Sequence, residues 1–186
     1  MHGEEILLDT EERMEKAISV LRSSLAGIRT GRANPGMVDS LKVEVYGSSV
    51  PIKQLGTVGA PEPNQIVIRP FDPTTIKEIE KSIQTADLGF NPQSDGRLIR
   101  INVPPLSMEV RRKMVARIRD LLEESKVALR NIRRDGNKAA DQAEKDKDLS
   151  EDDRDDTKQQ IQDLTKTYEN KAAEMAKSRE TEVLES

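Results

Sequence analysis

The spacing of apolar residues changes twice along this chain of 186 residues, and the change limits the folds it can adopt. Near the N-terminus, apolar side chains recur at intervals of four, three, four and three residues, at Met14, Ile18, Leu21, Leu25 and Ile28. This spacing places them along one side of a helix. We expect the helix to begin between Glu4 and Thr10 and to end at "RTGRANP", where Gly31 and Pro35 interrupt it. One interpretation of this end is a helix C-cap with Gly31 in a left-handed conformation.

Between residues 31 and 105 the apolar period becomes two, which is typical of strands with one buried face. The segments "LKVEVYG", "QIVIRPF" and "RLIRINVPP" alternate in this way. The segment "SSVPIKQL" is a weaker strand candidate, because Pro51 favours a sheet edge. One helix is expected after Asp72, a good N-cap followed by proline, with Ile76, Ile79 and Ile83 on its buried face.

After Pro105 the helical period returns in two long segments. The first is expected from Ser107 to about Lys145. The second begins after Ser150, where Asp153 three residues later resembles a capping box. Its apolar positions are Ile161, Leu164, Tyr168, Ala172 and Met175.

These elements predict an α+β chain of two domains. The first helix cannot bury its apolar side alone, so we expect it to pack on the two later helices. The result is a long antiparallel three-helix bundle of residues 1–30 plus 106–186, with a small β/α/β domain, residues 31–105, inserted between its first two helices. The connections at 30–34 and 103–105 are predicted hinges, with a rigid junction as the alternative; their residues are Thr30, Gly31, Arg32, Ala33, Asn34, Val103, Pro104 and Pro105.

Composition argues against an enzyme, a cofactor or a metal site. The chain has no cysteine and a single histidine, His2, and it carries no glycine-rich nucleotide-binding motif. The segment "DKDLSEDDRDDT" resembles a calcium loop, but Glu151 stands where the loop needs glycine and Thr157 where it needs glutamate. The chain has no apolar run long enough for a membrane span, and its acidic start does not resemble a signal peptide. A reducing cytoplasm suits this composition.

Positive charge is concentrated in one segment, although the net charge is −4. Residues 107–140 contain ten Lys and Arg against five Asp and Glu, whereas residues 141–186 contain eight against fifteen. Arg112, Arg119, Lys126 and Arg133 are seven residues apart, so they form one line along the helix. The line predicts contacts with phosphates, for which the planar arginine fork is well suited. The alternative is a solvated face whose cations pair with Glu123, Asp120 or the acidic third helix.

The predicted RNA-binding set extends this line with its neighbours. Arg29 and Arg32 join it from the "IRTGRANP" segment, where capping of the helix end explains Arg29 better than Arg32. With two Phe, two Tyr and no Trp, recognition of RNA should depend on backbone and shape. The set is Arg111, Arg112, Arg119, Lys126, Arg130, Arg133, Arg134, Arg29 and Arg32.

Together these motifs resemble the ribosome recycling factor family. The stretches "IRTGRANP", "YGSSVPIKQL", "DLGFNP", "VPPLSMEVRRK", "VALRNIRRDGN" and "DKDLSEDD" occur in the order of that family, from about Met14 to Met175. One departure is Gly136, where family members usually have alanine. Glycine should weaken the helix there by up to about 1 kcal/mol.

The resemblance implies an L-shaped protein, similar in outline to transfer RNA, that acts in the cytoplasm as a monomer. It implies that the bundle lies on large-subunit rRNA near the intersubunit bridges, with conserved arginines at Arg111, Arg130 and Arg133. It further implies that elongation factor G, with GTP, is the partner, and that the ribosome is split with release of mRNA and deacylated tRNA. A non-catalytic coiled-coil adaptor is the alternative function.

Overall fold

We describe a computed structural model of the chain, which covers residues 2–86 and 88–185. The chain separates into two compact units. One unit contains the chain up to Arg29 together with Met108–Glu185, and the other contains Thr30–Ser107. Both segments predicted as hinges, 30–34 and 103–105, lie within the second unit near its borders with the first, and their motion stays a prediction.

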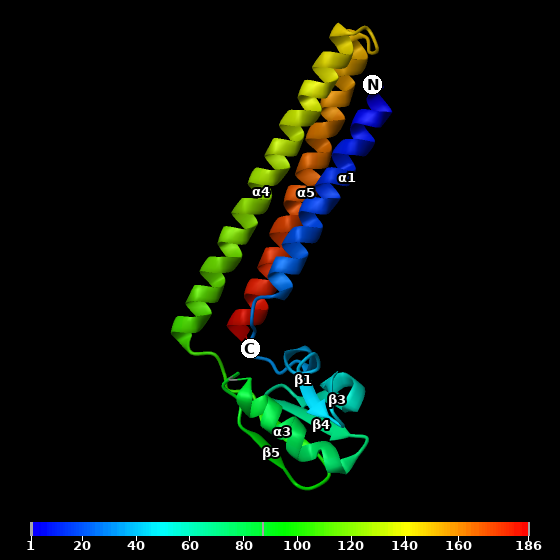
Figure 1. The fold of residues 1–186 in the computed structure, drawn as a ribbon. Helices are drawn as coiled ribbons and strands as arrows, with labels where there is room; N and C mark the ends of the chain where they lie inside the picture. Colours follow the sequence, from blue (N-terminus) through cyan, green and yellow to red (C-terminus); the bar gives the residue numbers. More distant parts are fainter. Residues whose placement is uncertain (1, 87, 186) are drawn as a thin grey trace. The chain divides into compact units, whose positions relative to one another are not determined.

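The first unit consists of the three long helices α1 (Gly3–Ala26), α4 (Met108–Lys145) and α5 (Glu151–Glu185). Helices α1 and α5 run in the same direction, and α4 runs opposite to both (Figure 1). The predicted side of α1 is buried, including Ile28, which lies two residues beyond the end of the helix. It packs against Ile118, Leu121 and Leu129 of α4 and against Tyr168, Ala172 and Ala176 of α5.

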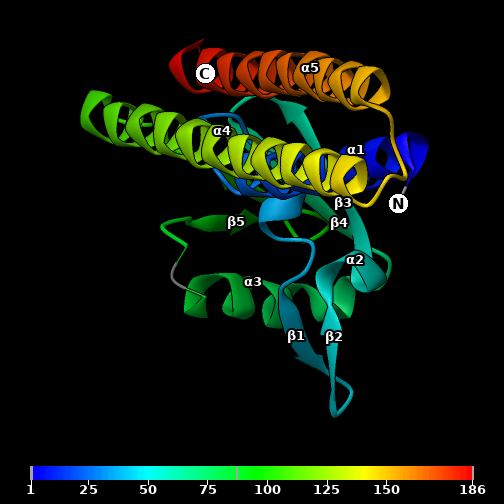
Figure 2. The same ribbon diagram turned by 90° about the horizontal axis from the view of Figure 1, so that it is seen from above.

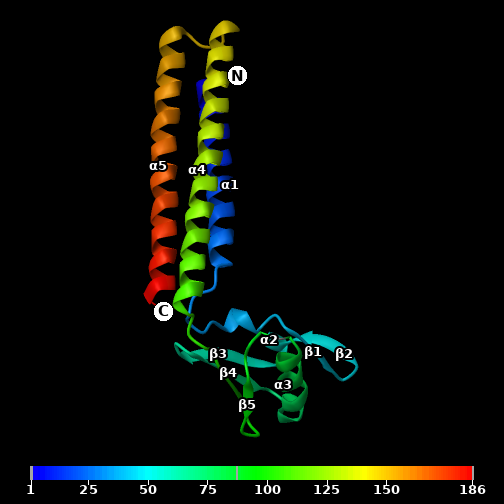
Figure 3. The ribbon, with the colours of Figure 1, turned by 90° about the vertical axis from the view of Figure 1, so that its left-hand side faces the viewer.

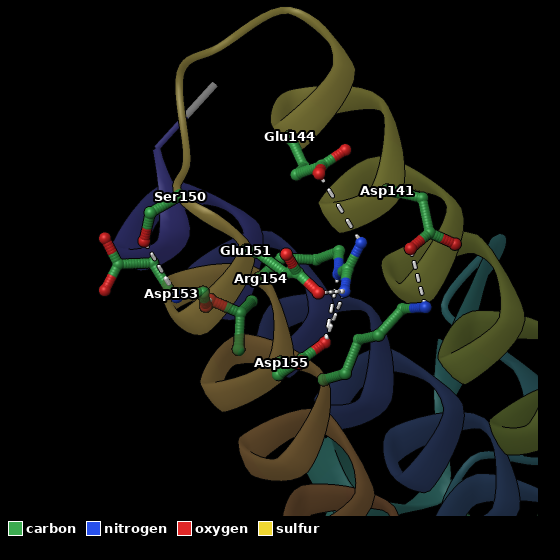
Figure 4. Close-up of polar contacts among 9 residues, drawn as sticks. Asp141, Glu144, Ser150, Glu151, Asp153, Arg154 and Asp155 are labelled. Atoms are coloured by element: carbon green, nitrogen blue, oxygen red, sulfur yellow. Dashed lines mark hydrogen bonds and ion pairs between the residues drawn. The ribbon is translucent and has the colours of Figure 1, made fainter.

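The turn between α4 and α5 is fixed by polar contacts (Figure 4). The Ser150 hydroxyl accepts a hydrogen bond from the Asp153 backbone N–H at 3.1 Å, which is the predicted N-cap. Arg154, in the first turn of α5, pairs with Asp155 at 2.9 Å and with Glu144 of α4 at 3.6 Å. The guanidinium group therefore links the end of α4 to the start of α5.

A buried tyrosine adds a polar contact between α1 and α5. The Tyr168 hydroxyl donates to Glu15 Oε1 at 2.7 Å, although the ring lies in the apolar core. Burial, together with the hydrogen bond to Glu15 and its negative charge, raises the pKa of Tyr168 well above its usual value. The phenol therefore stays protonated and keeps donating throughout the physiological pH range.

The second unit is built on antiparallel strands. Strands β1 (Lys42–Val45) and β2 (Ser48–Pro51) form a hairpin. Strands β3 (Gly56–Glu62), β4 (Gln65–Pro70), β6 (Ile99–Asn102) and β5 (Pro92–Ser94) form a second sheet in the order β3-β4-β6-β5. Helix α3 (Ile76–Thr85) lies along one face of this sheet (Figure 2), where its three isoleucines pack on Ile66, Ile68, Ile99 and Ile101.

The predicted fold class is confirmed, but several local predictions for the second unit are wrong. Strands β3 and β5 were not predicted, because "GTVGAPE" and "PQS" carry no apolar alternation. The segment "SSVPIKQL" is not one strand: after β2, residues Ile52–Leu55 form the short helix α2. The Asp72 carboxylate does accept from the Thr74 backbone N–H at 3.0 Å, but the helix there starts with a 3₁₀ turn.

The end of α1 also differs from the prediction. The helix ends at Ala26, and Gly27 follows it in a right-handed conformation. Gly31 does not take the left-handed conformation of the C-cap interpretation; among the described glycines, positive φ occurs at Gly47, Gly89 and Gly96. Arg179 of α5 donates to the carbonyl oxygens of Ala26 and Ile28, so the open end of α1 is capped from another helix.

Gly136 fills a place where α4 comes very close to α1 and α5. A Cβ atom at this position would lie 2.9 Å from Thr10 Oγ1 and 3.1 Å from Ile161 Cδ1. Both neighbours are buried, so neither can move away freely. Glycine therefore weakens the helix locally but permits close packing of all three helices.

We predict that Gly136→Ala lowers the free energy of unfolding by about 1 kcal/mol, because crowding outweighs the gain in helix propensity. Urea denaturation followed by circular dichroism measures the change. Adding Thr10→Ala removes the nearest crowded atom, so the double variant should recover most of the loss. A single variant more stable than the parent chain would contradict this account of the packing.

Candidate nucleic-acid interface

The predicted cations lie along α4, which presents one long side to solvent (Figure 3). We call Arg112, Arg119, Lys126 and Arg133 the cationic line. A spacing of seven residues is close to two helical turns, so the four side chains stay on one side of α4. They lie next to the buried positions of this helix. Arg112 and Arg119 are exposed, whereas Lys126 and Arg133 are half-buried. The line therefore follows the border between the core and the solvent.

Contacts with α5 show on which edge of α4 the line lies. Arg119 Nη2 is 3.1 Å from Glu180 Oε1, and Arg133 Nη1 donates to Gln162 Oε1 at 3.4 Å. Both partners belong to α5. The cationic line therefore borders the groove between α4 and α5, not the groove between α4 and α1.

Two of the predicted cations are neutralised within the chain. The Arg119 side chain is 70% exposed and its partner Glu180 26% exposed, so the carboxylate is the more fixed of the two groups. Arg130 Nη1 lies 3.7 Å from Glu123 Oε1 on the same helix. The ion-pairing alternative is therefore observed for these two cations, and their contact with phosphate stays a prediction. Ion pairs this exposed are worth roughly 0–1 kcal/mol, so a phosphate can displace them.

Two further members of the set keep their charge available. Arg112 and Arg134 are exposed and form no ion pair with any other residue that the structure describes. They stand near opposite ends of the basic segment, 22 positions apart, which corresponds to about 33 Å along a helix. An anionic partner that meets both must therefore follow α4 for several turns.

Arg111 has a structural contact that the sequence did not indicate. Its Nη1 atom donates to the backbone oxygens of Leu184 at 2.7 Å and of Val183 at 3.3 Å. These carbonyls belong to the last turn of α5, whose oxygens have no partner within the helix. The guanidinium therefore caps α5, and its predicted RNA contact stays untested.

The two arginines of "IRTGRANP" fall in different units. Arg29 follows α1 in the bundle, is half-buried, and has a buried Nε atom without a hydrogen-bond partner among the described residues. Arg32 is exposed and belongs to the second unit. Their predicted RNA contacts stay predictions.

Among the described residues, no group of His, Cys, Asp or Glu side chains could hold a metal ion. No described helix is long and apolar enough to cross a membrane. The groove between α1 and α4, about 180 Å³ in volume, is lined mainly by apolar side chains such as Ala17, Leu21 and Leu121.

Comparison with known proteins identifies the family. The family described as "Ribosome recycling factor" matches residues 21–184. The ribosome-recycling factor of Rhodopirellula baltica is 69% identical over 140 residues, which is 75% of each chain. That of Nitratidesulfovibrio vulgaris is 45% identical over 185 residues and covers 100% of both chains.

Solved structures agree with the sequence relatives. A solution structure of a ribosome recycling factor superimposes with a TM-score of 0.74 at 37% identity, covering 100% of this chain and 99% of the other. A second structure, with a TM-score of 0.63 and 41% identity, covers 99% of this chain and 100% of the other. It contains the ribosome recycling factor of T. thermophilus and elongation factor G of E. coli, bound to the E. coli post-termination complex. The resemblance found in the sequence motifs is thus confirmed, and the chain belongs to the ribosome recycling factor family.

Proposed function

We propose that the chain binds post-termination ribosomes and, with elongation factor G and GTP, splits them into subunits, releasing mRNA and deacylated tRNA. Support comes from the sequence identity of 45%, over the full length of both chains, to a protein named as a ribosome-recycling factor. It also comes from the 41% identical factor that shares a post-termination complex with elongation factor G. In this proposal elongation factor G hydrolyses the GTP, and the chain itself hydrolyses nothing. It acts as a monomer in the cytoplasm.

The cationic line is the surface proposed to meet the ribosome. Its contacts are the phosphates of large-subunit rRNA near the intersubunit bridges. Arginine donates bidentately to phosphate, and each contact releases counterions from the RNA. The observation that carries this proposal is the row of basic side chains along the solvent border of α4, from Arg112 to Arg133.

The acidic helix restricts how RNA can approach. Helix α5 carries Glu180 into the same groove as Arg119, while Glu151, Asp152 and Asp153 lie in its first turn. Phosphates are repelled by these carboxylates. RNA is therefore proposed to lie over the outer side of α4. On binding, a phosphate replaces Glu180 as the ion-pair partner of Arg119.

A polysome breakdown assay tests the function as a whole. Purified protein, elongation factor G and GTP should convert post-termination polysomes to free subunits, as followed by sucrose-gradient sedimentation. Leaving out the protein, the elongation factor or GTP should leave the particles intact. Equal breakdown with and without this protein would rule out the proposed function.

We predict that Arg133→Ala weakens ribosome binding by roughly 1–3 kcal/mol, the scale of a lost charge-assisted contact. Folding should be nearly unchanged, because Arg133 makes only a 3.4 Å hydrogen bond to Gln162. The matched control is Arg117→Ala, which removes an arginine of the same helix that pairs with Glu124 and lies outside the line. Co-sedimentation with ribosomes measures both affinities. Equal losses for the two variants would contradict a specific role of the line.

We predict that Glu180→Gln strengthens ribosome binding by up to about fivefold near 0.1 M salt, because Arg119 no longer has to leave a carboxylate. The slope of log affinity against log salt should steepen by about one. Glu124→Gln, which frees Arg117 instead, is the control. Weaker binding by Glu180→Gln would show that the pair positions Arg119 for its contact instead of competing with it.

A further inference from the structure

The four-stranded sheet of the second unit has one face that α3 does not cover. In antiparallel pairs, directly opposed residues share a face. The pairs Thr57–Arg69, Gly59–Val67, Val67–Arg100, Gln93–Arg100 and Gln65–Asn102 are all opposed in this way. The isoleucines under α3 occupy the alternate positions. Glu62, which is opposed to Gln65, belongs to the first set as well. We call this set the outer sheet face: Thr57, Gly59, Glu62, Gln65, Val67, Arg69, Gln93, Arg100 and Asn102.

This face is open and almost entirely polar. Thr57, Arg69, Gln93, Arg100 and Asn102 are exposed. A Cβ atom built at Gly59 would meet no atom within 4 Å, so the space above this residue is open. The only apolar side chain of the set is Val67, which is half-buried. One half-buried valine supplies much less apolar area than the centre of a typical protein interface.

The face carries two arginines and one carboxylate, so its net charge is positive by one. Arg69 lies two residues beyond Val67, the direct partner of Arg100, so the two arginines are diagonal neighbours on adjacent strands, roughly 7–8 Å apart. Neither guanidinium forms a hydrogen bond or an ion pair with another described residue. Glu62, opposite Gln65 at one end of the face, supplies the nearby negative charge of these strands.

The carboxylate of Asp95, in the turn before β6, accepts hydrogen bonds mainly from backbone groups of its own turn. The backbone N–H groups of Arg97 and Leu98 donate to its carboxylate at 3.0 and 3.1 Å. They lower the pKa of Asp95, with a smaller contribution from the charge of Arg100. The arginine side chains thus remain available to an external anion.

We infer that the outer sheet face is a second RNA-binding surface of this chain, separate from the cationic line. The inference rests on the proposed ribosomal function for its choice of RNA. Arg69 and Arg100 contact phosphates of one backbone segment, and the amides of Gln65, Gln93 and Asn102 hydrogen-bond sugar hydroxyls or base edges. No exposed aromatic ring stands in the set, so recognition depends on backbone and shape.

The test is equilibrium binding of the full chain to purified 70S ribosomes over a range of salt concentrations. The double variant Arg69→Gln/Arg100→Gln should bind about tenfold more weakly near 0.1 M salt, and its salt slope should fall by about two. The control is Lys77→Gln/Lys81→Gln, which removes the same charge from exposed positions of α3, on the covered side of the sheet. Unchanged affinity and slope in the arginine variant would overturn the inference.

A second measurement distinguishes RNA from a protein partner. The chain contains no cysteine, so Gln93→Cys can carry a single tethered iron–EDTA group on the outer sheet face. Hydroxyl radicals from this site should cut rRNA in the bound complex, and those from Lys77→Cys should cut it much less. Loss of affinity without rRNA cleavage would assign the face to a ribosomal protein and overturn the RNA assignment.

The outcomes for the two surfaces are separable. If the parent chain binds ribosomes and Arg133→Ala weakens that binding while the sheet variant does not, the sheet inference alone fails. If the sheet variant loses affinity and Arg133→Ala does not, the cationic line is wrong and the outer sheet face stands. A parent chain that does not bind ribosomes would overturn both.

Discussion

The packing of α1 against two helices from the other end of the chain is the interaction on which this structure depends. The apolar side of α1 can be buried only in the groove that α4 and α5 form together. A single glycine, Gly136, sets how closely the helices approach in one part of the bundle. Polar side chains then fix the ends: Arg154 links α4 to α5, Arg179 caps α1 and Arg111 caps α5.

The same bundle explains why its basic surface is only partly available. A three-helix bundle brings the flank of α4 against α5, which is rich in carboxylates. Charges that the sequence separates into a basic and an acidic segment therefore meet in space, as at Arg119 and Glu180. Such exposed pairs are weak, so they tune the affinity for an anionic partner without preventing its binding. The second unit differs, because Arg69 and Arg100 are exposed and form no hydrogen bond or ion pair with another described residue.

The long helices were predictable from sequence because their signals are local and repeated. Five apolar positions at helical spacing identify α1, and Ser150 with Asp153 marks the start of α5. Strands β3 and β5 were not predictable in this way, because only their pairing with β4 and β6 defines them. The cations of α4 could be found from their spacing. Their partners could not, since Glu180 and Gln162 lie 61 and 29 residues away in the chain.

The long sequence separation within the bundle has a consequence for the synthesis of the chain. Helix α1 ends at Ala26, and its first partner, α4, begins only at Met108. At elongation rates of 5–20 residues per second, the nascent chain waits on the order of ten seconds before α4 is complete. During this time the inserted unit can already fold, because the residues of its apolar core all lie between Ala33 and Val103. The apolar side of α1 meanwhile has no native partner, and is therefore the segment most open to capture by chaperones on its own ribosome.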